Sequence, residues 1–435
     1  MTTCVVGLGK IGLPLAVQIA SKGEDVIGCD ISSDVVDLVN KGQVPFPGEA
    51  NLSELLNKVC AQNLLEATTN TKEAVTRADS VVVVVPVIVD EAANPDFSAI
   101  DSATLDIATG LQPNTLICYE TTLPIGTTRN RFAPLLQEIS GLDPGTDFYL
   151  AYSPERVFSG RIFTDLRTYP KLVGGINNAS TKRAITFYER VLDFDHRPDL
   201  SQPNGVWDLG EAEAAEMAKL VETTYRNVNI ALANEFAIHA EELAIDIGSI
   251  IQAANSQPFS HIHNPGIAVG GHCIPVYPKF YLSTHSSATL PQVAITVNES
   301  MPQRAVEELK RAFQNDTEEK RIAILGAAYR GGVKETAFSG VFSLVNEITN
   351  IGWRPLVHDP LFSGNELREL GFEPFTLGSP CDAAIIQTDH QMYNEINADD
   401  LPEAKYLYDG RRIISSSQVA PITLIQLGSI TSTNL

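Results

Sequence analysis

Cysteine pairs, basic charge and long apolar runs are all scarce in this sequence. Its six cysteines are widely separated and include no C-x-x-C pair, which argues against a disulfide framework or zinc ribbon and for reduced thiols in the cytoplasm. Lys and Arg number 31 against 53 Asp and Glu, a net charge of −22, so nucleic-acid binding through a basic face is disfavoured. The longest apolar run, residues 81–89, is short of the roughly 20 residues that span a bilayer. The N-terminus has no basic segment typical of a secretory signal.

What the chain does have is enough length and apolar content for several packed domains. It has 435 residues, 44% of them apolar, and about 150 residues per domain is usual, so we expect two or three domains. In residues 1–195, short β-branched runs alternate with helical stretches, which predicts a doubly wound parallel sheet. The expected strands are Cys4–Gly7, Asp25–Asp30, Ser80–Pro86, Thr115–Glu120 and Phe148–Ser153.

Residues 196–300 are expected to form a central helical region. Its periodic pattern runs over 211–247 and is interrupted by Gly248, so we predict a helix long enough to bridge domains or to pack against a second subunit. A Gly/Pro/His-rich stretch at 256–278 predicts a loop. Residues 301–435 are expected to form a second, smaller α/β domain with strands in 321–329, 353–360, 383–390 and 404–414. The predicted fold class is α/β, with two Rossmann-like domains joined by a helical dimerisation region.

A glycine motif of dinucleotide-binding type, GLGKIG, lies between the first predicted strand and helix. Its glycines would allow a tight turn, close approach of a pyrophosphate and close helix–sheet packing, and the helix N-terminus would attract the phosphates. Asp30, at the end of the second strand, would bind the ribose hydroxyls and repel a 2′-phosphate, which favours NAD over NADP. The alternative is a purely structural glycine turn. The predicted NAD-binding residues are Gly7, Gly9, Lys10, Ile11, Gly12 and Asp30.

A second constellation is the loop Asn264–Pro278, NPGIAVGGHCIPVYP. Cys273 follows two glycines between prolines, where Gly270 and Gly271 would let a substrate approach and a thiolate could attack a carbonyl. The residues alone leave a buried, inert thiol as an equal alternative.

This loop resembles that of the UDP-glucose/GDP-mannose dehydrogenase family, in particular its UDP-N-acetylhexosamine 6-dehydrogenase branch. The resemblance covers nearly the whole chain, in order, through the motifs GLGKIG, ETTLPIGTT (120–128), YSPERVFSG (152–160), EMAKLVETTYRNVNIALANE (216–235), GGHCIP and GAAYRGGVKET (326–336). It implies an NAD-dependent enzyme that oxidises a primary alcohol of a nucleotide sugar to a carboxylate with two NAD molecules, in a homodimer. The aldehyde would be held on Cys273 as a thiohemiacetal and then a thioester.

The resemblance also implies further catalytic residues. Lys219 matches the lysine that stabilises oxyanions and Glu155 the glutamate of thioester hydrolysis. Thr122 matches a threonine that positions water, and we expect it to be a cofactor-binding residue as well. Without the resemblance, Lys219, Thr223 and Asn227 would be taken as a solvated helix face, and Glu155 and Thr122 as cap or turn residues.

Substrate binding is implied for a further set of positions. Arg330 aligns with a substrate-binding lysine and Arg411 lies in YDGRR, although each arginine could form a surface salt bridge instead. His272, beside Cys273 and downstream of His261 and His263, could suggest a metal, but no ligand spacing supports one and we expect none. The expected substrate-binding residues are Glu155, Lys219, Thr223, Gly270, His272, Arg330 and Arg411.

Four positions depart from the family pattern. A catalytic aspartate is replaced by Tyr277, an asparagine by Thr223, a cofactor-contacting arginine by Ala337, and a threonine-containing turn by Pro86-Val87-Ile88. We therefore expect a UDP-sugar 6-dehydrogenase acting on UDP-N-acetylmannosamine or UDP-N-acetylglucosamine in polysaccharide precursor synthesis. UDP-glucose is the alternative substrate, and a degraded nucleotide-sugar-binding homologue the alternative function. A dehydrogenase of small hydroxy acids would leave GGHC and the second nucleotide domain unexplained.

Overall fold

The computed structural model describes residues 1–90, 94–314, 316 and 318–429. The chain divides into two compact units: unit 1 comprises Met1–Glu222 and Lys279–Thr284, and unit 2 comprises Thr223–Pro278 and His285–Leu435. Residues 430–435, which the sequence assigns to the third domain, lie outside the described residues. The predicted three-domain boundaries stay a prediction.

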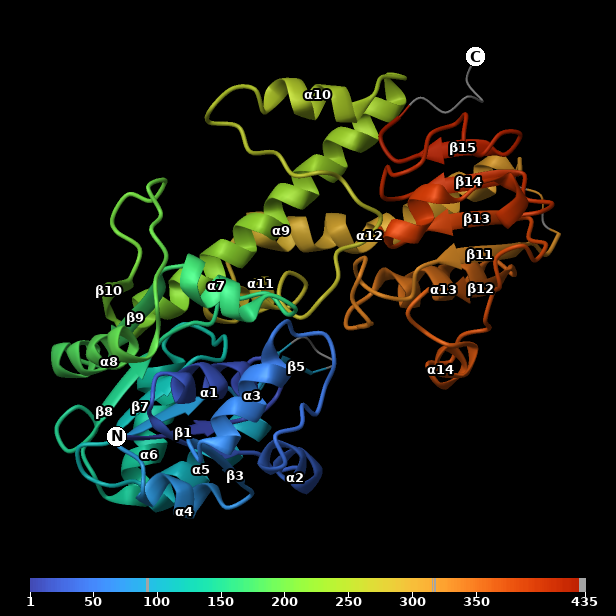
Figure 1. The fold of residues 1–435 in the computed structure, drawn as a ribbon. Coiled ribbons are helices and arrows are strands. Elements are labelled where there is room, and N and C mark those ends of the chain that lie inside the picture. The colour runs from blue at the N-terminus through green and yellow to red at the C-terminus, as the bar shows by residue number, and fades with distance from the viewer. Residues whose placement is uncertain (91–93, 315, 317, 430–435) are drawn as a thin grey trace. The chain divides into compact units, whose positions relative to one another are not determined.

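Unit 1 contains an eight-stranded sheet in the order β10-β9-β8-β7-β4-β1-β2-β3 (Figure 1). Every pair is parallel except β8 with β9. The strands are β1 (Thr2–Val6), β2 (Asp25–Cys29), β3 (Leu65–Thr68), β4 (Ser80–Val83), β7 (Leu116–Tyr119), β8 (Tyr149–Tyr152), β9 (Lys171–Gly175) and β10 (Val206–Glu211). A separate antiparallel pair joins β5 (Ile88–Val89) to β6 (Pro95–Asp96).

Helices cover the two faces of this sheet (Figure 1). One group packs α1 (Gly12–Ser21) with α3 (Leu52–Ala61) and α7 (Ile162–Thr168); another packs α4 (Thr71–Thr76), α5 (Ser98–Gly110) and α6 (Ala133–Ser140). The remaining helices are α2 (Ser33–Asn40), η1 (Thr128–Phe132) and α8 (Asn178–Val191). Because both faces are covered, central strands such as β4 and β7 are buried at every residue, which is why they appear in the sequence as unbroken apolar runs.

Unit 2 contains a parallel five-stranded sheet in the order β12-β11-β13-β14-β15. Its strands are β11 (Arg321–Leu325), β12 (Arg354–His358), β13 (Ala383–Ile386), β14 (Tyr406–Asp409) and β15 (Thr423–Gln426). Its short helices are α13 (Gly340–Asn350), α14 (Gly364–Glu369), η2 (Gln391–Glu395) and η3 (Ala398–Asp400). One face of the sheet packs through Ile322, Ile324 and Ile385 on Val341 and Leu344 of α13.

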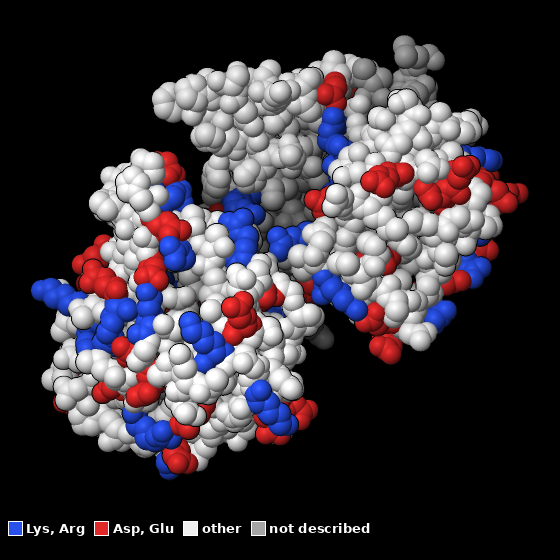
Figure 2. All heavy atoms as spheres, in the orientation of Figure 1, with Lys and Arg blue, Asp and Glu red and all other residues white. Residues whose placement is uncertain are grey.

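Two long helices and two short ones complete the described fold. Helix α9 (Ala212–Glu242) begins in unit 1 and continues in unit 2; α10 (Ile247–Ala254), α11 (Tyr277–Thr284) and α12 (Thr289–Ala312) follow it. No described helix is long and apolar enough to cross a bilayer. Red and blue side chains are interleaved over much of the face drawn in Figure 2, whereas the surface over most of α10 is uncharged.

The α/β fold class, with two largely parallel sheets and a long central helix, is confirmed. The predicted loop is confirmed over 256–276, where the described chain has neither helix nor strand, whereas 277–278 belong to the helix that follows. The predicted end of the long helix is wrong. Helix α9 stops at Glu242, Ala244 takes a left-handed φ of 53°, and the Asp246 carboxylate caps α10 through the Ser249 N–H at 2.8 Å.

Gly248 therefore lies in the first turn of α10 and ends no helix. A Cβ there would come within 2.9 Å of the Arg412 guanidinium, so this glycine makes room for a side chain. The sequence after Ile414 shows no clear pattern, yet it supplies β15 at the sheet edge.

Candidate functional site

The GLGKIG turn joins β1 to α1 in a geometry that requires glycine at two positions. Gly7 has a φ of +95°, and a Cβ on Gly12 would lie 1.8 Å from the Gly7 carbonyl oxygen. A Cβ on Gly9 would meet no atom of the described residues within 4 Å, so with respect to those residues this side of the turn is open to a ligand. Lys10 and Ile11 occupy the turn directly before α1.

Asp30 follows β2 and anchors the same turn. Its carboxylate accepts hydrogen bonds from the Leu8 N–H at 2.9 Å and from the Ser32 N–H at 2.9 Å. The open glycine, the helix N-terminus and this half-buried carboxylate fit the pyrophosphate and ribose of a dinucleotide. The predicted NAD-binding residues are thus brought together at one end of β1 and β2.

Thr122 and Glu155 follow β7 and β8 in the same unit. Parallel strands end at one edge of a sheet, so these two residues and the GLGKIG turn share the carboxyl edge where α/β proteins bind ligands. Thr122 is buried. Glu155 accepts hydrogen bonds at Oε1 from the Arg156 and Val157 N–H groups, at 2.6 and 3.2 Å, and at Oε2 from the Lys171 ammonium at 3.0 Å.

These contacts determine the ionisation of Glu155. Burial opposes its charge, but the nearby Lys171 and the backbone donors prevail and hold the pKa of Glu155 below its ordinary value. The carboxyl group is therefore ionised at neutral pH. A cap or turn role alone would not need a buried lysine as a partner.

Helix α9 carries Lys219, Thr223 and Asn227 along one face. All three are buried, so the alternative of a solvated face is wrong. The Asn227 side-chain N–H donates to the Ile274 carbonyl at 3.4 Å, and its Oδ1 has no hydrogen bond within the described part of the chain. Lys219 belongs to unit 1, whereas Thr223 and Asn227 belong to unit 2.

Cys273 lies in unit 2 at the end of the long loop and is the exposed member of the six cysteines. Its carbonyl accepts hydrogen bonds from the Val276 and Tyr277 N–H groups, at 3.2 and 2.9 Å, which form the turn that enters α11. This exposure excludes the alternative of a buried, inert thiol.

The two glycines before it have a packing role. A Cβ on Gly270 would lie 2.7 Å from the Tyr329 Cβ, and one on Gly271 would lie 2.9 Å from the Tyr329 ring. The Gly271 N–H also donates to the Ala337 carbonyl at 2.9 Å. His272 is exposed, with Nε2 3.6 Å from Glu335 Oε1. The cysteine loop is thus seated on the segment 329–338 that follows β11.

Both predicted substrate arginines lie in unit 2 near this loop. Arg330 follows Tyr329 and has its guanidinium carbon 5.7 Å from that ring centroid. Arg411 donates from Nε to the Gln387 carbonyl at 2.6 Å, and a Cβ on Gly266 would lie 3.0 Å from its Nη1. Burial lowers the pKa of Arg411, although Asp389 and Asp409 oppose that shift.

The sequence missed the side chains that hold these loops. In unit 2, Asp389 accepts a hydrogen bond from the Gly331 N–H at 2.8 Å and His390 Nδ1 from the Gly332 N–H at 3.2 Å. In unit 1, Glu120 and Lys171 form a buried ion pair beside Glu155. For the pair in unit 1, the sequence did contain one indication, because Lys171 is a charged residue at the start of a buried strand.

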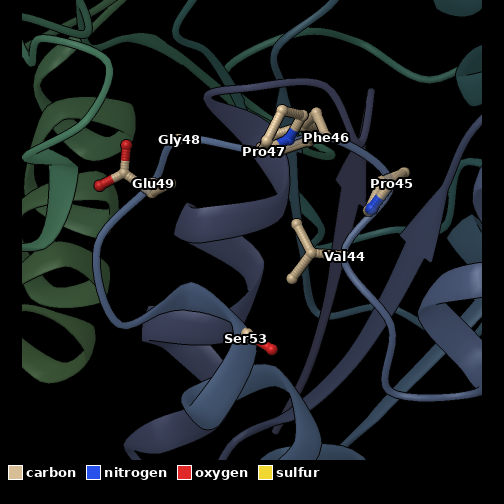
Figure 3. Close-up of a pocket in the computed structure, with 7 residues that line it drawn as sticks. All are labelled: Val44, Pro45, Phe46, Pro47, Gly48, Glu49 and Ser53. Carbon is tan, nitrogen blue, oxygen red and sulfur yellow. The ribbon is translucent and has the colours of Figure 1, made fainter.

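The described residues contain no candidate metal site, and a pocket among them lies away from the site residues above. No group of three His, Cys, Asp or Glu side chains that could hold a metal is found among the described residues. A pocket of about 380 Å³ is lined by 44–49 and Ser53 (Figure 3). Glu49, on its wall, accepts hydrogen bonds from the Gly160 and Ile162 N–H groups at 2.6 and 2.8 Å, so it fastens the loop that follows Glu155.

Comparison with known proteins gives matches along the chain. Residues 1–192, 213–301 and 323–416 match the NAD-binding, central and UDP-binding domains of the UDP-glucose/GDP-mannose dehydrogenase family. The chain is 34% identical over 426 residues to a UDP-N-acetyl-D-mannosamine dehydrogenase of Pyrococcus horikoshii, covering 96% of this chain and 97% of that protein. It is 31% identical over 428 residues to the enzyme of that name from Methanococcus maripaludis, covering 95% and 93%.

A solved structure agrees with these matches. The UDP-D-ManNAc dehydrogenase structure from Pyrococcus horikoshii superposes with a TM-score of 0.86 at 32% identity, covering 98% of this chain and 99% of that one. The comparisons confirm the family resemblance, the enzyme class of NAD-dependent UDP-sugar dehydrogenase and the NAD cofactor predicted from the sequence.

Proposed function

Because this chain belongs to the UDP-glucose/GDP-mannose dehydrogenase family, we propose that it oxidises C6 of a UDP-N-acetylhexosamine to the uronic acid. The substrate is UDP-N-acetylmannosamine or UDP-N-acetylglucosamine, and the relatives named UDP-N-acetyl-D-mannosamine dehydrogenase support this choice. The observation that carries the proposal is the exposed Cys273 on a glycine loop seated beside Arg330 and Arg411. The product serves polysaccharide precursor synthesis, and the six free cysteines fit a cytoplasmic enzyme.

The chemistry assigns a covalent role to Cys273. NAD held by the GLGKIG turn and Asp30 would supply the hydride acceptor for each of the two oxidations at C6. In the first oxidation the C6 hydroxyl also loses its proton, which gives the aldehyde. The Cys273 sulfur adds to the C6 aldehyde and the aldehyde oxygen takes a proton, which gives a thiohemiacetal. Loss of a hydride and the hydroxyl proton then gives a thioester. Water attacks that carbonyl, the C–S bond breaks with its electron pair on sulfur, and the carboxylate leaves.

Other residues support this sequence of steps. Lys219 stabilises the oxyanions, Thr122 positions water near the cofactor, and Glu155, ionised beside Lys171, takes a proton from the attacking water. Arg330 and Arg411 bind the diphosphate, while Thr223, Gly270 and His272 contribute to the sugar site. Accordingly, we assign residues 1–195 to NAD binding, 196–300 to the central region and 301–435 to UDP-sugar binding.

A homodimer is also proposed. Along α9, Met217, Val221, Leu232 and Phe236 are between 41 and 49% exposed although they are large and apolar. On α10, over which the surface in Figure 2 is largely uncharged, the apolar Ile250 is exposed as well. Apolar side chains repeated along a helix of this length are typical of a twofold interface.

A second candidate is a nucleotide-sugar-binding protein without turnover. It is favoured by Tyr277, which stands in place of the family's catalytic aspartate and cannot act as a carboxylate, and by Ala337, which has no guanidinium for the cofactor. The contact of Ala337 with the cysteine loop is a backbone one, in which its carbonyl accepts a hydrogen bond from the Gly271 N–H.

The test is NADH formation, followed by absorbance, with UDP-N-acetylmannosamine, UDP-N-acetylglucosamine, UDP-glucose and GDP-mannose. The proposal expects turnover of a UDP-N-acetylhexosamine with two NADH per acid and no free aldehyde. Cys273→Ala should abolish acid formation and leave UDP-sugar binding nearly intact, whereas replacing Cys118, which is buried, should alter stability only. Preferential oxidation of UDP-glucose would overturn the substrate assignment, and NAD binding with no turnover of any sugar would establish the second candidate.

A further inference from the structure

Lys171 is a buried charge to which the reaction scheme above assigns no role of its own. It opens β9, the strand that pairs antiparallel with β8 through Gly174 and Gly175, and its side chain is 5% exposed. Its ammonium lies 2.7 Å from Glu120 Oε2 and 3.0 Å from Glu155 Oε2. An ammonium withdrawn from water this far is stable only with such partners.

The two carboxylates around Lys171 differ in their access to solvent. Glu120 directly follows β7 and has a fully buried side chain, and its Oε1 accepts a hydrogen bond from the Tyr188 hydroxyl at 2.6 Å. The Glu155 side chain is 12% exposed at the carboxyl edge of the sheet. The chain of contacts therefore runs from the interior, through Tyr188, Glu120 and Lys171, to one reachable carboxylate.

The directions of the pKa shifts agree with this asymmetry. Burial raises the pKa of Glu120 to about 7, with Lys171 opposing and the Glu155 charge reinforcing the shift. The pKa of Glu155 is lowered, as described above. At neutral pH Glu155, the carboxylate that faces outward, is therefore ionised, whereas Glu120 is close to the midpoint of its titration.

The other ionisable groups packed around Glu120, Glu155 and Lys171 do not change the ionisation of the two carboxylates. Burial raises the pKa of the Cys118 thiol on β7 to about 12, and that of the Tyr188 phenol on α8 well above its ordinary value, so both are neutral. Arg156, beside Glu155, is paired with Glu222 at 2.8 Å. Arg183 on α8 adds a positive charge near Cys118.

We propose that Lys171 is the positioning residue for Glu155: it keeps that carboxylate ionised and fixes its direction, while Glu120 and Tyr188 hold the ammonium in place. This inference rests on the proposed role of Glu155 in thioester hydrolysis. There, the carboxylate accepts one proton of the attacking water while the C–S bond breaks and the sulfur of Cys273 keeps the electron pair. A protonated Glu155 could accept no proton, so hydrolysis depends on the charge that Lys171 maintains.

The test replaces the ammonium and follows the charge on Glu155 directly. In full-length Lys171→Met, the infrared carboxyl band of Glu155 is assigned from the difference spectrum against Lys171→Met/Glu155→Gln. The midpoint of its titration should lie about 1–3 pH units above the wild-type midpoint. This measurement needs no turnover. Lys22→Met, which removes the surface ion pair to Asp193 in the same unit, is the matched control and should leave the midpoint unchanged. Lys171→Gln carries the same expectation and serves where the Met variant does not fold.

Kinetics test the consequence. In Lys171→Met we expect kcat to fall roughly 100-fold at neutral pH with KM within about twofold, a covalent sugar adduct to accumulate on intact mass, and activity to recover as pH rises. Lys171→Arg, which keeps the charge, should retain most of the activity. A Glu155 band that titrates as in the wild type, or a fall in kcat with no adduct and no recovery at high pH, would leave Lys171 a structural strand anchor and overturn the inference. Absence of acid formation by the wild type would instead refute the proposed function, with the infrared midpoint still deciding the role of Lys171.

Discussion

Asp359 directly follows β12 in unit 2, as Asp30 follows β2 in unit 1, and removing its carboxylate should lower the free energy of unfolding. The residue is 3% exposed, and its side chain is fully buried. Oδ2 accepts hydrogen bonds from the Ala327 and Ala328 N–H groups at 2.8 and 2.9 Å and lies 3.1 Å from His390 Nε2. Oδ1 accepts the Leu361 N–H at 2.9 Å. Asp30, by comparison, accepts two backbone donors and is half-buried.

The size of the loss follows from the donors left behind in Asp359→Ala. Ala327 and Ala328 are fully buried, and an orphaned buried donor costs about 1–3 kcal/mol, so these two predict a loss of about 2–6 kcal/mol. Leu361 is 37% exposed, so water can replace its lost acceptor. Asp359→Asn can keep the carbonyl toward the two buried donors and should lose about 1–2 kcal/mol.

The pH dependence of this contribution has a definite sign. Burial opposes the charge of Asp359, but the His390 and backbone donors prevail and hold its pKa below the ordinary value. Its folded pKa is thus below the unfolded one, so its contribution is complete above about pH 4 and is lost as pH falls through the folded pKa. The stability gap between the wild type and Asp359→Asn, which does not titrate, should narrow below about pH 4.

Tryptophan fluorescence can report the free energy of unfolding of unit 2 alone. The chain has two tryptophans, and Trp353 is buried in unit 2 with its ring edge-on to Phe313 at 5.4 Å. In a Trp207→Phe background, urea unfolding of Trp353 should therefore report unit 2. Asp30→Asn in this background is the control and should leave that transition unchanged. An Asp359→Ala transition within about 0.5 kcal/mol of the wild type would refute the estimate that buried donors need this carboxylate.

Three further outcomes are expected. Asp30→Ser should relax the preference for NAD over NADP by removing the anion that repels a 2′-phosphate; equal catalytic efficiency of the wild type with both cofactors would show that Asp30 does not contact the ribose. Phe236→Glu should weaken a twofold interface along α9 and lower the mass measured by light scattering at micromolar concentration; a wild-type monomer would contradict the dimer. Lys219→Ala should be severely impaired, and the double variant with Cys273→Ala little worse than the worse single one, because residues that act as a unit are not additive; clear additivity of the two losses in turnover would show that they act independently.

Local sequence determined the α/β class and much of its order. Strands buried on both faces appear as unbroken apolar runs, and a glycine turn between strand and helix permits few conformations, so β1, β4, β7 and the GLGKIG turn could be predicted directly. The Cys273 loop and the family motifs were visible for the same reason, since each is contiguous in sequence. The prediction that the long helix ends at Gly248 was wrong, because a glycine that makes room for Arg412 cannot be distinguished in the sequence from one that ends a helix.

Tertiary structure alone decided which polar groups meet. Glu120, Glu155, Lys171 and Tyr188 come from four separate segments, and no local pattern links them. Exposure was decided in the same way: Cys273 is exposed and Lys219 buried, although the residues by themselves allowed the reverse. The physical reason is that burial and ion pairing depend on contacts between distant parts of the chain, whereas strand, turn and helix propensities depend on neighbours within a few residues.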